Sequence, residues 1–187
     1  GDIFFNFERL DGTSFDDNLT GDDGDNAIFS VDGTNILRGG AGDDQLTGNS
    51  HDFINDDLDI LHGEDGNDKL TYKPMTEIHG GNGEDQFFIF DNNLTIDLSS
   101  VVATNIETIY AEGSNANITL TLGDLITVTD EENQLMVMGW SDDTVNLSAS
   151  DAWVQGADQT IDNETYNSYS VGGATLLIDD DITQVIS

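Results

Sequence analysis

A nine-residue pattern constrains this chain more than any other feature. Residues 39–47 read Gly-Gly-Ala-Gly-Asp-Asp-Gln-Leu-Thr, a complete copy of G-G-x-G-x-D-x-U-x in which U is a large apolar residue. Further copies, some with fewer glycines, begin at positions 12, 21, 30, 63 and 80. Glycine tolerates a left-handed backbone, so the first six residues predict a tight loop. The last three, with one apolar centre, predict a short strand.

The apolar residue of each copy predicts how the copies pack. A single loop and strand cannot bury its apolar side chain alone, so neighbouring turns must stack into a solenoid. Stacking would align the apolar residues as one ladder, made of Leu19, Ile28, Leu37, Leu46, Leu61, Leu70, Ile78 and Phe87.

Oxygen-bearing side chains fill the sixth position of the copies, and they suit a hard cation such as calcium. They are Asp17, Asn26, Asn35, Asp44, Asp59, Asp68 and Asp85. The chain also has 38 Asp and Glu against 4 Lys and Arg, a formal charge of −34, and no Cys. This charge argues against nucleic acid and anionic membranes as partners. Without a bound cation, self-repulsion should keep the chain expanded.

The nonapeptide resembles the calcium-binding repeat of RTX proteins. The resemblance implies an all-β fold: a calcium-bound parallel β-roll, or β-solenoid, followed by a C-terminal β-rich capping region. It also implies that two loops on the same edge enclose each ion, so the loop at Gly12 pairs with Ser30, Gly21 with Gly39, and Ser30 with Gly48. The residues expected to bind several calcium ions are Asp17, Gly21, Asp23, Asp25, Asn26, Asn35, Gly39, Ala41, Asp43, Asp44, Asp59, Gly63, Asp65, Asn67, Asp68, Gly80, Asn82, Glu84 and Asp85.

The repeat loses its phase twice. The turn from Gly48 through His62 has 15 residues instead of nine, which predicts a bulged insertion at residues 50–55. The segment 72–79 has eight residues and contains the single proline. The second segment should lack a complete calcium site. His51, His62 and His79 have no cysteine near them, so solvated surface histidines are expected rather than a zinc site.

The residue pattern divides the chain into three parts. Residues 1–11, where Ile3, Phe5 and Phe7 alternate, should form an N-terminal capping strand, and residues 12–90 the RTX roll. Residues 91–187 should form a β-rich region with a helical turn at 123–126 and with Trp140 and Trp153 as packing residues. Strands are predicted there at 94–98, 106–110, 118–122, 135–138, 144–147, 166–170 and 174–178.

A second resemblance involves three short segments, at residues 105–109, 143–147 and 173–179. They are similar to the C-terminal region of very large, repeat-rich bacterial adhesins exported by type I secretion. The resemblance implies an uncleaved export signal near 174–187, read by an inner-membrane ABC transporter, with the rest of the adhesin upstream. It also implies an extracellular or cell-surface location. We expect a monomer that is a piece of a longer protein, with no transmembrane segment.

The sequence predicts a calcium-dependent folding and secretion module rather than an enzyme. Neither H-E-x-x-H nor G-x-S-x-G occurs, although calcium rolls also terminate secreted proteases and lipases. A ligand-binding adhesive domain, for carbohydrate or a surface and stabilised by calcium, is the alternative. Ice binding is disfavoured because the third loop positions are irregular: Ser14, Asp23, Asp32, Ala41, Ser50, Asp65 and Asn82.

Overall fold

The computed structural model describes residues 7–48, 57–113, 115–130 and 132–187. The chain forms two compact units. The first comprises Gly1–Phe87 with Ala103–Asn105, and the second comprises Phe88–Val102 with Ile106–Ser187. The predicted capping residues Ile3 and Phe5 and the predicted insertion at 50–55 lie outside the described residues.

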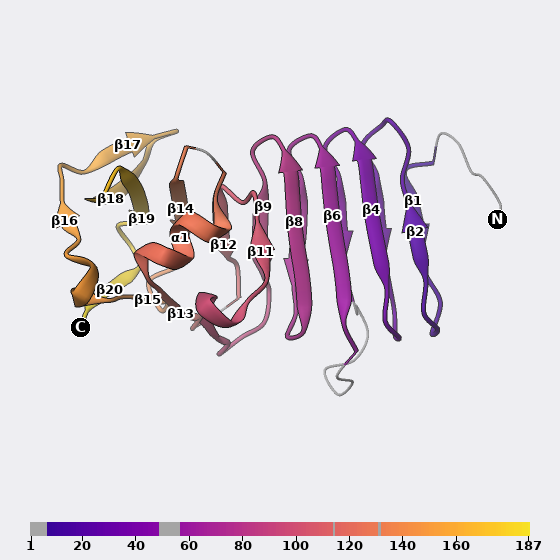
Figure 1. The fold of residues 1–187 in the computed structure, drawn as a ribbon, viewed down its shortest axis with the longest axis horizontal. Helices are drawn as coiled ribbons and strands as arrows, with labels where there is room; N and C mark the ends of the chain where they lie inside the picture. Colours follow the sequence, from indigo (N-terminus) through magenta and orange to yellow (C-terminus); the bar gives the residue numbers. More distant parts are fainter. Residues whose placement is uncertain (1–6, 49–56, 114, 131) are drawn as a thin grey trace. The chain divides into compact units, whose positions relative to one another are not determined.

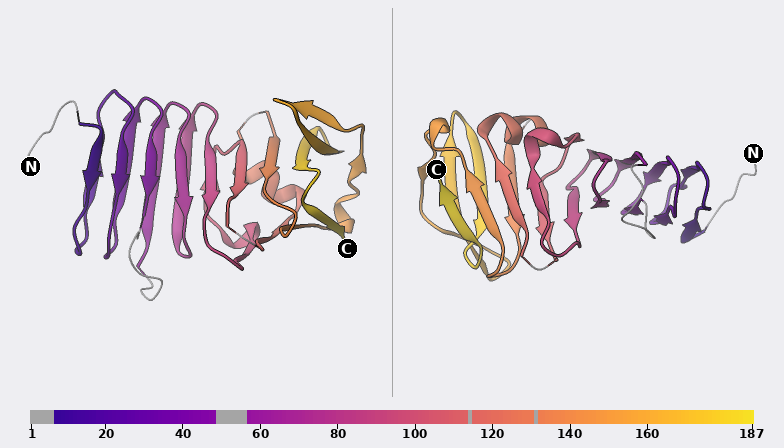
Figure 2. Two further views of the ribbon diagram at one scale, coloured as in Figure 1. Left: turned by 180° about the vertical axis from the view of Figure 1, so that it is seen from behind. Right: turned by 90° about the horizontal axis from the view of Figure 1, so that it is seen from below.

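Parallel strands wind the first unit into a roll, because successive strands alternate between two sheets. One sheet has the order β1 (Arg9–Asp11), β3 (Ala27–Phe29), β5 (Gln45–Thr47), β7 (Lys69–Tyr72) and β9 (Gln86–Ile89). The other has the order β2 (Asn18–Thr20), β4 (Ile36–Ala41), β6 (Asp59–Asp65), β8 (Thr76–Asn82) and β11 (Ala103–Thr104). Figure 1 shows β2, β4, β6 and β8 side by side, and Figure 2 shows the stack from behind.

The apolar positions of the repeat form the core of the roll. Ile28, Leu37, Leu46, Leu61, Leu70, Ile78 and Phe87 are buried, whereas Leu19 is half-buried. The predicted single ladder is wrong: residues nine apart fall on different sheets, so there are two ladders. In one sheet Ile28 aligns with Leu46 and Leu46 with Leu70, and in the other Leu37 aligns with Leu61 and Leu61 with Ile78.

The second unit also has two sheets, and one of them is parallel throughout. That sheet has the order β10 (Thr95–Asp97), β13 (Asn117–Leu120), β15 (Thr144–Leu147) and β20 (Thr183–Ile186). In the other, β12 (Thr108–Ala111), β14 (Gln134–Met138) and β19 (Ala174–Asp179) run parallel. Antiparallel strands follow: β18 (Glu164–Val171) pairs with β19, β16 (Val154–Gln155) and β17 (Gln159–Ile161).

Short helices interrupt the strands of the second unit. The α-helix α1 (Leu122–Val128) begins at a capping box, in which Asp124 Oδ2 accepts from the Thr121 backbone N–H and Thr121 Oγ1 accepts from that of Asp124. This cap ends β13 at Leu120, so the strand predicted over 118–122 is shorter. The remaining helices are 3₁₀ turns, η1 (Leu98–Ser100) and η2 (Ala149–Asp151).

The predicted role of Trp140 is wrong. Its side chain is 54% exposed because it lies in the turn after β14 rather than on an inward-facing strand position. Trp153 is half-buried, as expected of a packing residue, although its indole N–H has no hydrogen-bond partner.

Candidate metal centre

The loops of the roll lie along two edges, because each loop joins one sheet to the other. The loops 21–26, 39–44, 63–68 and 80–85 follow β2, β4, β6 and β8, and we call this the first edge (Figure 1). The loops 12–17 and 30–35 and the segment that starts at Gly48 follow β1, β3 and β5, and form the second edge. Every nearly complete copy of the glycine-rich loop is therefore on the first edge.

The sixth-position side chain holds successive turns together on both edges. On the first edge Asp44 Oδ1 accepts from the Asn26 N–H at 2.7 Å, and Asp68 Oδ1 accepts from the Asp44 N–H at 2.8 Å. On the second edge Asn35 Oδ1 accepts from the Asp17 N–H at 2.9 Å, and Asp59 Oδ1 from the Asn35 N–H at 3.0 Å. These bonds confirm the predicted pairing of same-edge loops.

The other carboxylate oxygen of two first-edge residues has no hydrogen-bond partner. Asp44 is 2% exposed and Asp68 0%, and the Oδ2 atom of each is buried and unpaired. A Cβ added to Gly39 would collide with Asp44 Oδ2 and the Gly63 carbonyl oxygen. A Cβ on Gly63 would meet Asp68 Oδ2 and the Gly80 carbonyl oxygen in the same way. Oxygens thus converge where glycine leaves space, an arrangement suited to a calcium ion.

When no cation is present, burial disfavours the ionised form of these carboxylates. It raises the pKa of Asp44 to about 7 and that of Asp68 to about 6, against the lowering effect of the backbone hydrogen bonds that they accept. Neighbouring acids, including Asp43 and Asp65 around Asp68, raise the pKa further. A bound divalent cation would reverse both effects, because it favours the ionised form.

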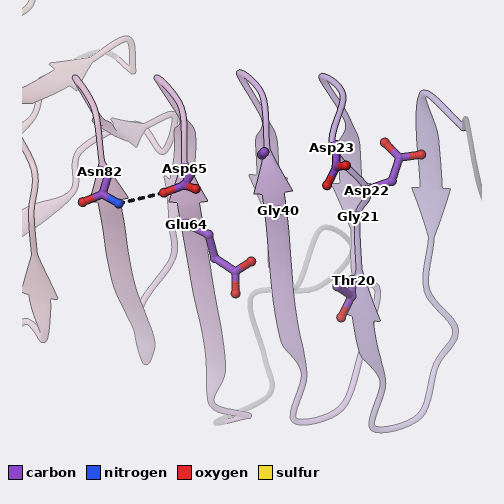
Figure 3. A pocket seen from close by; sticks show the side chains of 9 residues that line it. Thr20, Gly21, Asp22, Asp23, Gly40, Glu64, Asp65 and Asn82 are labelled. Atoms are coloured by element: carbon purple, nitrogen blue, oxygen red, sulfur yellow. Dashed lines mark hydrogen bonds between the residues drawn. The ribbon is translucent and has the colours of Figure 1, made fainter.

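The third-position residues face a pocket on the first edge. Figure 3 shows part of its lining, including Asp23, Asp65 and Asn82, with Asn82 Nδ2 donating to Asp65 Oδ1 at 2.7 Å. The full lining is Thr20, Gly21, Asp22, Asp23, Gly40, Ala41, Glu64, Asp65 and Asn82. Five of the predicted metal residues therefore line the pocket: Gly21, Asp23, Ala41, Asp65 and Asn82.

The fifth-position residues make a second set of bonds between turns, which the sequence reasoning missed. Asp25 Oδ1 accepts from the Asp43 N–H at 2.9 Å, Asp43 Oδ1 from the Asn67 N–H at 2.8 Å, and Asn67 Oδ1 from the Glu84 N–H at 2.9 Å. These four side chains, all in the predicted metal set, are exposed. An acidic or amide residue at the fifth position of every first-edge loop was the available signal.

The second edge uses its oxygens differently. Asp17 Oδ2 accepts from the Thr13 backbone N–H at 2.6 Å. The Asn35 amide donates to the Gly33 carbonyl and to Asp59 Oδ1, each at 2.8 Å. Asp59 resembles the first-edge residues instead: its Oδ2 atom is buried without a hydrogen-bond partner, and burial raises its pKa.

The prediction of solvated histidines is wrong for His62 and His79. Both are half-buried, and their rings stack with centroids 4.9 Å apart because the two residues are in register on β6 and β8. His79 Nδ1 also lies 2.9 Å from Thr104 Oγ1. Burial, the largest cause, lowers the pKa of His62. His51 lies outside the described residues.

No group of three or more His, Asp or Glu side chains arranged for a metal occurs in the described parts of the chain. An ion on the first edge would therefore take much of its coordination from loop carbonyls. Among the same residues, no helix is long and apolar enough to cross a membrane.

Comparison with known families agrees with this geometry. Residues 6–31, 29–52 and 53–71 match the family model of the RTX calcium-binding nonapeptide repeat. The chain has no match among curated proteins. RTX repeats bind calcium, have a structural rather than a catalytic role, and are typical of secreted proteins that fold with calcium and leave through type I systems. Residues 6–71 thus carry the RTX calcium-binding nonapeptide repeat, and the strands described within that range form a parallel β-roll.

Proposed function

We propose that this chain is the calcium-dependent folding and secretion module of a large extracellular RTX adhesin. Residues 12–90 would be the calcium roll, and 91–187 a β-rich region that carries the export signal near 174–187. The observation that carries the proposal is the row of buried first-edge carboxylates, of which Asp44 and Asp68 have an unpaired oxygen. Such a row needs cations to be stable in its charged form.

Calcium would act as the switch between export and folding. Cytosolic calcium is scarce, so a chain with charge −34 and buried carboxylates would remain expanded and could thread a type I channel. Outside the cell, ions at the affinity of extracellular modules would bind the loops, and their binding energy would become folding energy.

The burial of the proposed export signal supports this order of events. Its first part is β19, which lies between β14 and β18, and Leu176, Leu177 and Ile178 are buried there. An ABC transporter could not contact these side chains in the folded chain. The signal would therefore be readable only before folding.

A calcium titration tests the folding proposal. We expect circular dichroism and hydrodynamic radius to report collapse of an expanded chain to a compact β protein on adding calcium, and no collapse with magnesium. A chain that is already compact in chelator would contradict the proposal.

An export assay tests the signal. In a reporter fused upstream of this chain, deletion of residues 174–187 should abolish export. The matched control is Ile118→Asp, which disrupts the second-unit core outside the signal and should be exported without folding afterwards. Equal export of the deletion and the intact chain would remove the signal assignment.

A second candidate, carbohydrate binding, is favoured by one feature of the second unit. The Phe88 ring stacks on Phe90 with centroids 5.4 Å apart and lies 5.0 Å from that of Tyr110, and Phe90 is 43% exposed. Exposed apolar patches mark binding sites. Glycan-array binding that is lost in Phe90→Ser, but kept when the similarly exposed Val102 is changed to Ser, would support this function.

A further inference from the structure

The loops differ in what the backbone N–H of their second residue does. In loop 12–17 the Thr13 N–H donates to Asp17 Oδ2 at 2.6 Å, and in loop 21–26 the Asp22 N–H donates to Asn26 Oδ1 at 2.8 Å. In the second unit the Trp140 N–H donates to Asp143 Oδ2 at 2.7 Å. We call these loops closed, because the sixth-position oxygen, or its counterpart at Asp143, is occupied from within the loop.

The loops 39–44, 63–68 and 80–85 have a different backbone, and we call them open. Their second residues, Gly40, Glu64 and Gly81, have φ values of 116°, 81° and 125°. The strands β4, β6 and β8 continue through the third loop residue, and Gly40 pairs with Glu64 in the sheet. The left-handed second residue therefore belongs to the sheet ladder. Asp44 Oδ2 and Asp68 Oδ2 remain without a donor.

Glutamate at a left-handed position argues that the open backbone is imposed rather than incidental. Such a conformation is unfavourable for a residue with a Cβ, and it persists only where the surroundings fix it. Loop 63–68 has nonetheless the same open form as its glycine-bearing neighbour 39–44, with a buried, unpaired Asp68 oxygen.

Asparagine at the sixth position closes a loop by a further route. The Asn35 amide donates to the Gly33 carbonyl at 2.8 Å, and the Asn26 amide donates to the Phe7 carbonyl at 2.7 Å. The amide N–H₂ thus donates hydrogen bonds to carbonyl oxygens that would otherwise have a cation as their partner.

We propose that the second and sixth loop residues together select between ion binding and ion-free closure. Open loops 39–44, 63–68 and 80–85 form the calcium row, whereas loops 12–17, 21–26, 30–35 and 139–143 are closed by hydrogen bonds and need no ion. This assignment rests on calcium binding by the roll, and it names which loops hold the ions. It narrows the predicted metal set, since Asp17, Asn26 and Asn35 become hydrogen-bonding residues.

Asp143 and Asp44 form a matched pair within the chain. Both are buried, at 1% and 2% exposure, and each accepts a backbone N–H from the neighbouring turn at 2.7 Å through Oδ1, Ala116 for Asp143 and Asn26 for Asp44. They differ at Oδ2, which the Trp140 N–H occupies in Asp143 and which has no partner in Asp44. The same side chain is thus used with and without an ion.

The test counts calcium ions bound to the full 187-residue chain at saturating calcium, by isothermal titration after chelator removal, with urea unfolding alongside. Asp44→Asn should lower the ion count, because the open oxygen is replaced by an amide. Asp143→Asn should leave the count unchanged and lower stability, because one backbone N–H then faces an amide N–H₂. The double variant Asp22→Gly/Asn26→Asp, which opens loop 21–26, should raise the count.

The outcomes separate this assignment from the proposed function. If the intact chain binds calcium but Asp143→Asn lowers the ion count as much as Asp44→Asn does, the distinction between open and closed loops is wrong. An unchanged count in both Asp44→Asn and the double variant would also overturn it. A chain that binds no calcium at all would instead contradict the proposed function.

Discussion

The two edges of the roll share a scaffold and differ in how their loops use one oxygen. On both, a sixth-position Oδ1 atom accepts a backbone N–H from the neighbouring turn, as Asp44 does on the first edge and Asp59 on the second. The remaining oxygen is unpaired in Asp44 and Asp68 of the first edge, whereas on the second edge it is unpaired in Asp59 but accepts the Thr13 N–H in Asp17. The repeat therefore combines a structural bond, kept everywhere, with a metal ligand that individual loops can give up.

The largest difference between the edges should follow from filling the space beside the open carboxylate. A Cβ in Gly63→Ala would overlap Asp68 Oδ2 and lie 2.5 Å from the Gly80 carbonyl oxygen. We expect a loss of about 3 kcal/mol in the free energy of unfolding with calcium. In the control Gly12→Ala, the Cβ would lie 2.8 Å from Asp17 Oδ2 and 3.3 Å from the Phe29 carbonyl oxygen, so the loss should be about 1 kcal/mol. Equal losses in urea unfolding would contradict the comparison.

The next effect is the pH dependence of folding in the absence of metal. The folded-state pKa values of Asp44 and Asp68, about 7 and about 6, lie above the ordinary value of 3.8. The folded state therefore binds more protons than the unfolded chain between these values. The chain should be expanded in chelator at pH 8, and the stability of its fold should rise as pH falls towards 4. It should be lost again as pH rises through the folded pKa values.

The folding induced by calcium should show the opposite dependence on pH, and this dependence is the control. Ions compete with protons for the same oxygens, so the calcium concentration at the folding midpoint should increase as pH falls below 7. Asp44→Asn should flatten both pH profiles. A metal-free roll that loses stability between pH 8 and 5 would show that these carboxylates are stabilised as anions without calcium.

Much of the roll could be predicted because its determinants are local. The nine-residue spacing of Leu37, Leu46 and other apolar residues requires stacked turns, and the pairing of same-edge loops follows from the alternation of sheets. The number of ladders was missed because apolar periodicity gives spacing without specifying which sheet a strand joins. The strands of the second unit at 95–97, 108–111 and 144–147 were also found, because each has a buried apolar centre.

The features that could not be predicted depend on non-local contacts. A glutamate at position 64 does not indicate a left-handed backbone, because the register with the neighbouring strands imposes that conformation. Likewise, the fifth-position bonds of Asp25 and Asp43 require knowledge of the adjacent turn. The strand β20 was missed because its apolar residues Val185 and Ile186 are exposed, so it lacks the alternation that marks a buried strand.

A smaller effect should be the same on both edges. The fifth-position residues Asp25 and Asp16 each accept one backbone N–H from the next same-edge loop, from Asp43 at 2.9 Å and Thr34 at 3.0 Å. Replacing either by Ala should lower the free energy of unfolding in saturating calcium by about 1 kcal/mol and leave the number of bound ions unchanged, because only a hydrogen bond is lost. The control Gln45→Ala, at an exposed strand position, should change stability by less than about 0.5 kcal/mol. A lower ion count in Asp25→Ala would make Asp25 an ion ligand.

The smallest effect concerns the one open loop whose second residue is not glycine. Glu64→Gly relieves a left-handed backbone at φ 81°, and we expect the free energy of unfolding in saturating calcium to rise by only about 0.5 kcal/mol, since glycine also makes the unfolded chain more flexible. The exposed Glu84 is the control: Glu84→Gly gives no relief and should lower stability by about 0.5 kcal/mol. If Glu64→Gly instead weakens the fold in saturating calcium and lowers the ion count, the Glu64 carboxylate itself contributes to the ion row, and the open loops differ from the closed ones by more than one oxygen per loop.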